Sequence, residues 1–87
     1  MTYYLSARYD DRQSFYCKAE VEERGNTKTL LSYKTKVCRI KDGKVTFLPD
    51  WNYSNTTVRH VREFLRQEGF AVGSKDEMAK MYPVKAR

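Results

Sequence analysis

Apolar and polar residues alternate through much of the first half of the chain, which is the period of a β-strand with one buried face. The cleanest alternation covers residues 14–23, and its apolar members are Phe15, Cys17, Ala19 and Val21. Residues 2–9 alternate more loosely and are rich in β-forming side chains. Residues 29–40 form a long β-rich run that requires a bulge or bend near residues 33–36. We predict three strands here.

Two dipeptides, Gly25-Asn26 and Asp42-Gly43, mark reversals between these segments. Asp-Gly suits a two-residue type I′ turn, because both central residues of that turn have positive φ. The turn predicts a fourth strand over residues 44–48 and two cross-strand pairs, Ile40 with Val45 and Cys38 with Phe47. Sequential hairpins of this kind predict an antiparallel sheet.

After residue 50 the apolar period changes from two to that of a helix. In residues 55–68 the apolar side chains share one face, and they are Val58, Val61, Phe64 and Leu65. Ser54 is the expected N-cap, Tyr53 and Val58 have the spacing of a hydrophobic staple, and Gly69 ends the helix.

Ser74 and Glu77 form a capping box that begins a second helix over residues 75–82. Its apolar stripe consists of Met78, Met81 and Tyr82. Pro83 ends it, and we expect residues 84–87 to be a frayed basic tail.

The order of elements predicts the α+β class. We expect one domain over residues 1–87, with a four-stranded antiparallel sheet followed by two helices packed on one face (ββββαα). The other face of the sheet would then be partly exposed and carry tyrosines and lysines. An open sheet edge leaves two oligomeric states, a monomer or an edge-paired dimer.

Charge is distributed unevenly along the chain. The formal net charge is +6, but residues 1–26 hold four Lys/Arg and five Asp/Glu, whereas residues 27–87 hold thirteen and six. This asymmetry favours an acidic partner, either nucleic acid, a nucleoprotein or an acidic protein surface. The alternative is a solvated surface that keeps a small protein soluble.

Three groups of residues are candidates for binding. Arg59, Arg62 and Arg66 share one helix face, and their planar guanidinium groups suit phosphate. A basic, aromatic surface could form from Lys34, Lys36, Arg39, Lys41, Lys44, Tyr33, Tyr16 and Trp51. An anion could bind the helix start at Ser54, Thr56 and Thr57. In the alternative interpretation the cations are solvated, with Glu63 offsetting the arginines, and the aromatic rings lie in the core.

His60 lies beside the arginines and belongs to the same candidate surface. With Glu63 it could act as the general base of a small nuclease. A half-buried histidine that hydrogen-bonds the turn before the helix is the competing interpretation.

Other chemistry lacks a sequence signal. Cys17 and Cys38 lie in alternating strands that offset them, so we expect free thiols. No CxxC or HxxxH spacing indicates a metal, and no Gly-rich phosphate loop or nucleophile elbow indicates a cofactor or an enzyme. The N-terminus lacks the features of a signal peptide and no apolar run has transmembrane length, so we expect a cytoplasmic protein.

Two motifs carry a resemblance, Ser32-Tyr33-Lys34-Thr35 and the segment Ser54-Asn55-Thr56-Thr57-Val58-Arg59-His60 with Glu63-Phe64-Leu65. The chain resembles a family of small uncharacterised domains from Gram-positive bacteria, their phages and mobile elements. The resemblance implies a phage or mobile-element protein that acts in the host cytoplasm. Small proteins of that kind are often inhibitors or adaptors, and anti-CRISPR proteins, which target nucleoproteins, are one group of them.

Three functions therefore remain open. The first is a non-enzymatic interaction module that binds nucleic acid or a nucleoprotein through a basic face. The second is an inhibitor or adaptor that docks on a host protein through the exposed sheet face or edge. The third is a small nuclease.

Overall fold

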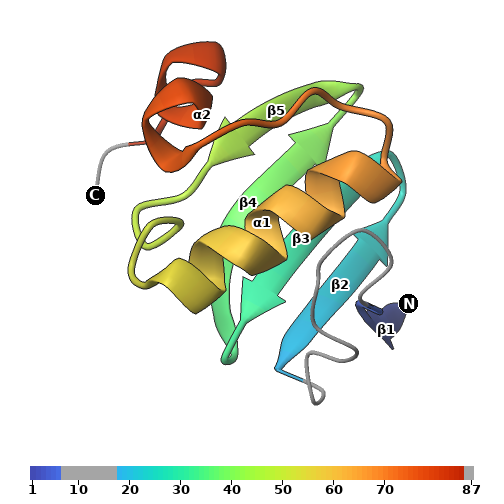
Figure 1. Cartoon of the computed structure of the whole chain (residues 1–87). Helices are drawn as coiled ribbons and strands as arrows, with labels where there is room; N and C mark the ends of the chain where they lie inside the picture. The colour runs from blue at the N-terminus through green and yellow to red at the C-terminus, as the bar shows by residue number, and fades with distance from the viewer. Residues whose placement is uncertain (7–17, 86–87) are drawn as a thin grey trace.

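The computed structural model describes residues 1–6 and 18–85. Five strands come first along the chain, and they are β1 (Thr2–Tyr4), β2 (Ala19–Arg24), β3 (Thr27–Ser32), β4 (Thr35–Lys41) and β5 (Lys44–Phe47). Two helices follow, α1 (Asn55–Gln67) and α2 (Lys75–Met81) (Figure 1). The predicted α+β class is confirmed.

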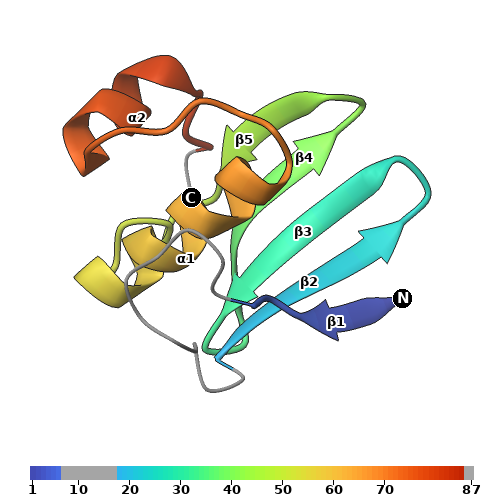
Figure 2. The ribbon, with the colours of Figure 1, turned by 45° about the vertical axis from the view of Figure 1, so that its right-hand side comes forward.

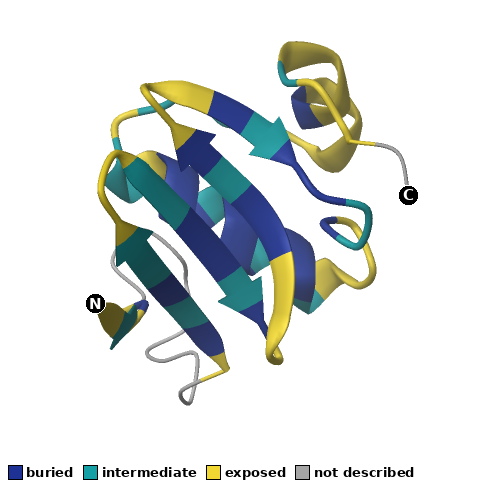
Figure 3. Ribbon diagram, turned by 180° about the vertical axis from the view of Figure 1, so that it is seen from behind, coloured by how far each residue is buried: buried dark blue, intermediate teal, exposed yellow. Residues whose placement is uncertain are grey.

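The strands form one antiparallel sheet in chain order, from β1 at one edge to β5 at the other. α1 crosses one face of this sheet and contacts β3 and β4, whereas α2 lies beside the β5 edge (Figures 1 and 2). Seen from behind, the opposite face carries no helix formed by the described residues (Figure 3). The expectation that both helices pack on one face is correct for α1. α2 instead lies at the β5 edge of the sheet.

The sheet has five strands where the sequence predicts four. The run over residues 29–40 is divided by a two-residue turn at Tyr33 and Lys34, with φ values of 51° and 69°. Positive φ at both central residues is the requirement of a type I′ turn, which glycine and asparagine usually fill. A tyrosine and a lysine give no such signal, so the sequence suggested a bend inside a single strand.

The predicted hairpin at Asp42-Gly43 has the expected register. Ile40 lies opposite Val45, and Cys38 lies opposite Phe47. The predicted irregularity is a shift between β3 and β4, because Leu30 pairs with Cys38 while Leu31 pairs with Lys36. Val37 is the extra residue, and it is buried beside Cys38. The bulge thus turns two consecutive side chains toward the core.

The core lies between α1 and the inner face of the sheet. The whole predicted apolar face of α1 is buried there, namely Val58, Val61, Phe64 and Leu65. Each fully buried side chain of this size contributes about 1.5–3 kcal/mol relative to exposure. Trp51 is also buried, and its ring stacks on Phe47 with centroids 4.4 Å apart. The buried apolar face therefore holds α1 against the sheet.

Both ends of α1 follow local rules. The Ser54 hydroxyl accepts a hydrogen bond from the amide of Thr57 at 3.2 Å, as expected of an N-cap. Gly69 has φ 85°, and the amide of Phe70 donates to the carbonyl of Leu65 at 2.9 Å, which closes the last turn. The predicted staple is wrong, because the Tyr53 side chain is 80% exposed and does not pack into the core.

The predicted capping box at Ser74 and Glu77 is present at the start of α2. Met78 is the buried residue of this short helix, whereas Met81 is 42% exposed and departs from the expected stripe. The following residues, expected to fray, instead contact β5. The amide of Phe47 donates to Pro83 at 2.9 Å, and the amide of Lys85 donates to Phe47 at 2.8 Å, around a parallel bridge to Val84.

Candidate functional site

A hollow of about 330 Å³ lies between the first half of α1 and the start of α2. We call it the cationic cleft, and it is lined by Asn55, Val58, Arg59, Arg62, Ser74 and Lys75. Three of these six side chains are cationic and none is acidic. The fold thus adds Lys75, which comes from a different helix, to two of the three predicted arginines.

Arg62 is held in place by a backbone contact. Its Nε donates to the carbonyl of Gly73 at 3.1 Å, which joins α1 to the connector before α2. Arg62 also lines the cleft. Arg59 is half-buried in the same cleft. Arg66 is exposed one turn further along and is not among the lining residues.

The start of α2 brings Lys75 to the cleft, and the two acidic residues of the same turn, Asp76 and Glu77, do not line it. Glu77 is turned toward the capping box, where its Oε1 accepts from the amide of Ser74 at 3.0 Å. These hydrogen bonds from Ser74 lower the pKa of the Glu77 carboxyl below its ordinary value. The Glu77 carboxylate therefore caps the start of its own helix.

A second cationic group lies on the open face of the sheet. We call it the basic sheet face, and it consists of Lys36, Arg39, Lys41 and Lys44. Arg39 alternates with the buried residues Cys38 and Ile40, so its side chain points away from α1. None of the ion pairs between described residues includes these four cations.

The predicted binding surface is therefore divided by the core. The arginines of α1 lie on the helix side of the sheet, while the basic sheet face lies on the side that no helix covers (Figures 1 and 3). Lys34 belongs to neither group, because its Nζ pairs with Glu20 Oε1 at 3.1 Å and this hydrogen bond raises the pKa of Lys34. Trp51 is buried, so it cannot offer a ring to an external base.

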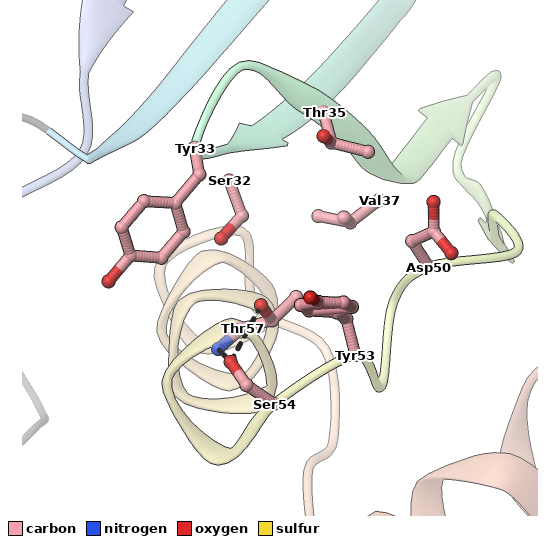
Figure 4. Close-up of a pocket in the computed structure, with 8 residues that line it drawn as sticks. All are labelled: Ser32, Tyr33, Thr35, Val37, Asp50, Tyr53, Ser54 and Thr57. Carbon is pink, nitrogen blue, oxygen red and sulfur yellow. Dashed lines mark hydrogen bonds between the residues drawn. The ribbon is translucent and has the colours of Figure 1, made fainter.

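A larger cavity of about 630 Å³ lies on the other side of the start of α1. We call it the tyrosine pocket. Tyr33 lies on one side of it and Tyr53 on another, and Val37 lines it from β4 (Figure 4). Hydroxyl groups line the space between these residues, and they come from Ser32, Thr35, Ser54 and Thr57. Asp50 adds a carboxylate at one end.

His60 is buried behind this pocket, with 1% of its surface exposed. Its Nδ1 lies 2.8 Å from the hydroxyl oxygen of Ser32, and its ring lies 5.9 Å from that of Tyr33. The sequence suggested a half-buried histidine, whereas His60 is fully buried and its hydrogen bond with Ser32 runs to β3. His60 instead joins α1 to the hairpin that carries Tyr33.

Glu63 is buried as well, with 2% exposed, and its Oε2 accepts from Gln67 Nε2 at 2.7 Å. Glu63 is therefore buried rather than solvent-exposed beside the arginines, as the sequence had suggested. Burial removes both His60 and Glu63 from contact with any external substrate.

The predicted anion site at the start of α1 is largely occupied by the protein itself. The amide of Thr57 donates to Ser54, and the two hydroxyl oxygens lie 3.1 Å apart. Thr57 is buried and Thr56 is half-buried. The cap therefore satisfies groups that an anion would otherwise use.

Cys38 is a buried free thiol, and burial raises its pKa to about 12. Cys17 lies outside the described residues. Among residues 1–6 and 18–85, no group of three or more His, Cys, Asp or Glu could hold a metal ion. In the same part of the chain, no helix is long and apolar enough to cross a membrane.

A family model described as "Family of unknown function (DUF8033)" matches residues 3–80. The chain belongs to this family. No curated protein and no solved structure matches the chain. In this member of DUF8033 the cationic cleft and the tyrosine pocket both lie within the matched residues.

Sequence reasoning missed Lys75 in the cleft and Tyr53 in the pocket. Lys75 is the first residue after a capping serine, so the capping box gave its place on α2 but nothing about its neighbours on α1. Tyr53 had the spacing of a staple, which suggested a packing role. Only the contact between separate elements reveals either site.

Proposed function

We propose that this protein is a non-enzymatic interaction module that binds the phosphates of nucleic acid, free or within a nucleoprotein, through the cationic cleft. The convergence of Arg59, Arg62 and Lys75 on one hollow supports the proposal. Arginine presents a planar fork of donors that matches phosphate, and lysine adds a point charge.

Electrostatics gives the cleft a reason to bind an anion. Three cations held close together repel one another, and a bound phosphate offsets that repulsion. Binding through such contacts should weaken with salt, with a slope of about 0.7–0.9 per neutralised phosphate.

The absence of a catalytic role is part of this proposal. The acid–base pair that the sequence suggested is buried, because His60 is 1% exposed and Glu63 is 2% exposed. A general base must reach the proton that it abstracts. The buried pair therefore gives no support to a nuclease.

The biological setting is also proposed, and it rests on the resemblance of residues 30–82 to small domains of phages and mobile elements. In that setting the protein would act in the host cytoplasm. A nucleoprotein whose nucleic acid lies in an open channel is a suitable target, because its phosphates are already exposed.

The decisive experiment compares two double charge reversals. Arg59→Glu with Lys75→Glu changes the cleft and leaves the Arg62 contact with Gly73 intact. Lys41→Glu with Lys44→Glu changes the basic sheet face. Each variant lowers the formal net charge from +6 by 4, so the overall charge effect is matched.

Binding of a labelled oligonucleotide is measured by fluorescence anisotropy over a series of salt concentrations, after circular dichroism has shown that both variants are folded. The cleft variant should lose roughly tenfold in affinity at low salt and about 2 in the salt slope. The sheet variant should stay close to the parent protein. Equal losses in both would show that net charge alone drives binding, and retained binding in the cleft variant would overturn the proposal.

Docking on a host protein is the second candidate function, and the edge of β5 favours it. The amide and carbonyl of Phe47 point away from β4 and pair with residues 83–85, so by alternation those of Val45 point the same way. Residues 83–85 already pair with this edge at Phe47, so a strand from a partner would add beside Val45. Such a complex should survive moderate salt, unlike the phosphate complex.

A further inference from the structure

The tyrosine pocket is unused by the phosphate contacts of the cleft, yet it adjoins them. Ser54 and Thr57 line the pocket, while Asn55, Val58 and Arg59 line the cleft. Residues 54 and 55 are neighbours in the chain, so the two hollows share the first turn of α1 as a common rim. A single ligand can therefore reach both.

Two tyrosines bound the pocket with their rings in contact with solvent. Tyr53 is 80% exposed and Tyr33 is 52% exposed, although aromatic side chains of this size usually bury most of their surface. In Figure 4 their rings lie on different sides of the pocket, with Ser32 and Thr57 between them. The arrangement offers two flat apolar surfaces to a flat ligand.

The hairpin that carries Tyr33 is held in an unfavourable conformation. Tyr33 and Lys34 both have positive φ, which is costly for residues with a Cβ. The turn is fixed from two sides, by the amide of Tyr33, which donates to Lys18 at 2.8 Å, and by the contact between Ser32 and His60. These contacts thus hold the turn in this conformation and fix the Tyr33 ring at the pocket.

The chemistry of the lining selects the class of ligand. Hydroxyl groups of Thr35 and Ser54 can donate to or accept from the edge of a heterocycle. The Asp50 carboxylate at one end can accept a hydrogen bond from an amino or imino group of such a ring. An uncharged aromatic group with a polar edge fits these walls, and an anion joined to it could lie in the neighbouring cationic cleft.

We propose that the tyrosine pocket receives an unstacked nucleobase of single-stranded nucleic acid, whose backbone phosphate lies in the cationic cleft. This inference rests on the proposed function and specifies its ligand. Bases within a duplex are stacked on each other and cannot enter such a pocket, whereas bases of a single strand stack readily on aromatic side chains. The protein should therefore prefer single strands over duplexes.

The test measures the affinity of the full chain for a single-stranded oligonucleotide and for the duplex of the same sequence. Tyr53→Ala removes one wall of the pocket, and Tyr53→Phe keeps the ring. Tyr4→Ala is the matched control, because Tyr4 is 56% exposed on β1 and does not line the pocket. Tyr53 is exposed, so its replacement leaves the core intact.

Tyr53→Ala should weaken single-strand binding by about 5- to 150-fold, the range measured for stacking of one base, and leave duplex binding unchanged. Tyr53→Phe and Tyr4→Ala should bind like the parent protein. An oligonucleotide carrying 5-bromouracil should photo-crosslink at Tyr33 or Tyr53 in the parent protein. Crosslinks confined to other residues would overturn the inference.

The outcomes separate this inference from the proposed function. If Tyr53→Ala binds single strands like the parent protein while the cleft variant loses binding, the base pocket is wrong and the phosphate site stands. If a lysine- or arginine-rich peptide displaces the oligonucleotide by binding at the tyrosines, the pocket serves a protein partner and the inference is overturned. If the parent protein binds no nucleic acid, both proposals fail.

Discussion

The cationic cleft and the basic sheet face carry the same sign of charge but are built in different ways. The sheet face follows from alternation along the β4–β5 hairpin, so neighbours in the chain supply all four of its cations. The cleft requires two helices, a connector and one hydrogen bond from Arg62 to Gly73.

The difference concerns shape as well as origin. Side chains on an open sheet face diverge into solvent, where each cation is hydrated separately. In the cleft, side chains from α1 and α2 line one solvent-accessible hollow. Converging donors can contact one phosphate together, and solvent screens them less than isolated surface charges. Position relative to other elements therefore decides which cations form a site.

The largest expected effect tests the hydrophobic core that separates the two regions. Cys38 lies in this core, and burial raises its pKa from 9.0 to about 12. The thiolate is the reactive form, so its fraction near pH 8 should be about a thousandfold below that of an ordinary cysteine. A thiol reagent should modify Cys38 in the Cys17→Ser protein only after denaturation. Rapid labelling of the native protein would show that water reaches between the regions.

The same shift gives a pH dependence of stability. The pKa of Cys38 is higher in the folded state than in the unfolded state. The contribution of the neutral thiol to stability is therefore fully present below pH 9. The contribution should decline as pH rises from 9 toward 12. Urea titrations over this interval, with Cys38→Ala as the control, would measure it. A parent protein and control with parallel pH profiles would contradict the assignment.

The next effect should distinguish the regions by their dependence on α2. Met78 is fully buried and is the residue through which α2 enters the core. Met78→Ala should cost about 2–5 kcal/mol of unfolding free energy, because it leaves a cavity. Where the variant remains folded, Lys75 loses its fixed position and phosphate binding should weaken. Met81→Ala, at an exposed position of the same helix, is the control for both readouts.

Arg62→Lys sharpens the comparison further, because it keeps the charge and removes the Nε donor to Gly73. We expect a loss of about 0.5–1.5 kcal/mol in unfolding free energy, the net value of one hydrogen bond. Affinity for nucleic acid should fall less than in the charge-reversal variant. Arg66→Lys on the exposed part of α1 is the matched control. Equal behaviour of the two variants would mean that the Gly73 contact does not organise the cleft.

The smallest effect belongs to the sheet face. Lys41 and Lys44 lie directly opposite one another across the β4–β5 hairpin. Like charges in this arrangement are destabilising, so Lys44→Glu should raise the unfolding free energy by about 0.2–1 kcal/mol. Nucleic-acid binding should change little. Lys36→Glu, opposite Leu31, should show no such gain. A large loss of binding in Lys44→Glu would move the site to the sheet face.

Particular elements show how far sequence reasoning reaches. The Asp42-Gly43 hairpin, the cap at Ser54 and the capping box at Ser74 are each specified by residues within a few positions, and each was predicted correctly. The hairpin at Tyr33 and Lys34 was missed because its residues are poor formers of a type I′ turn. Tertiary contacts with β2 and α1 hold that turn, and no local pattern contains them.

By itself, the sequence determined the α+β class, the buried face of α1, the helix caps and the cationic surplus of the second half of the chain. These properties depend on periodicity and on neighbours in the chain, which a sequence displays directly. Only the tertiary structure decided that His60 and Trp51 are buried, that Lys75 joins Arg59 and Arg62, and that Tyr33 and Tyr53 bound one pocket. Packing brings distant segments together, and the accessibility of a side chain depends on that packing.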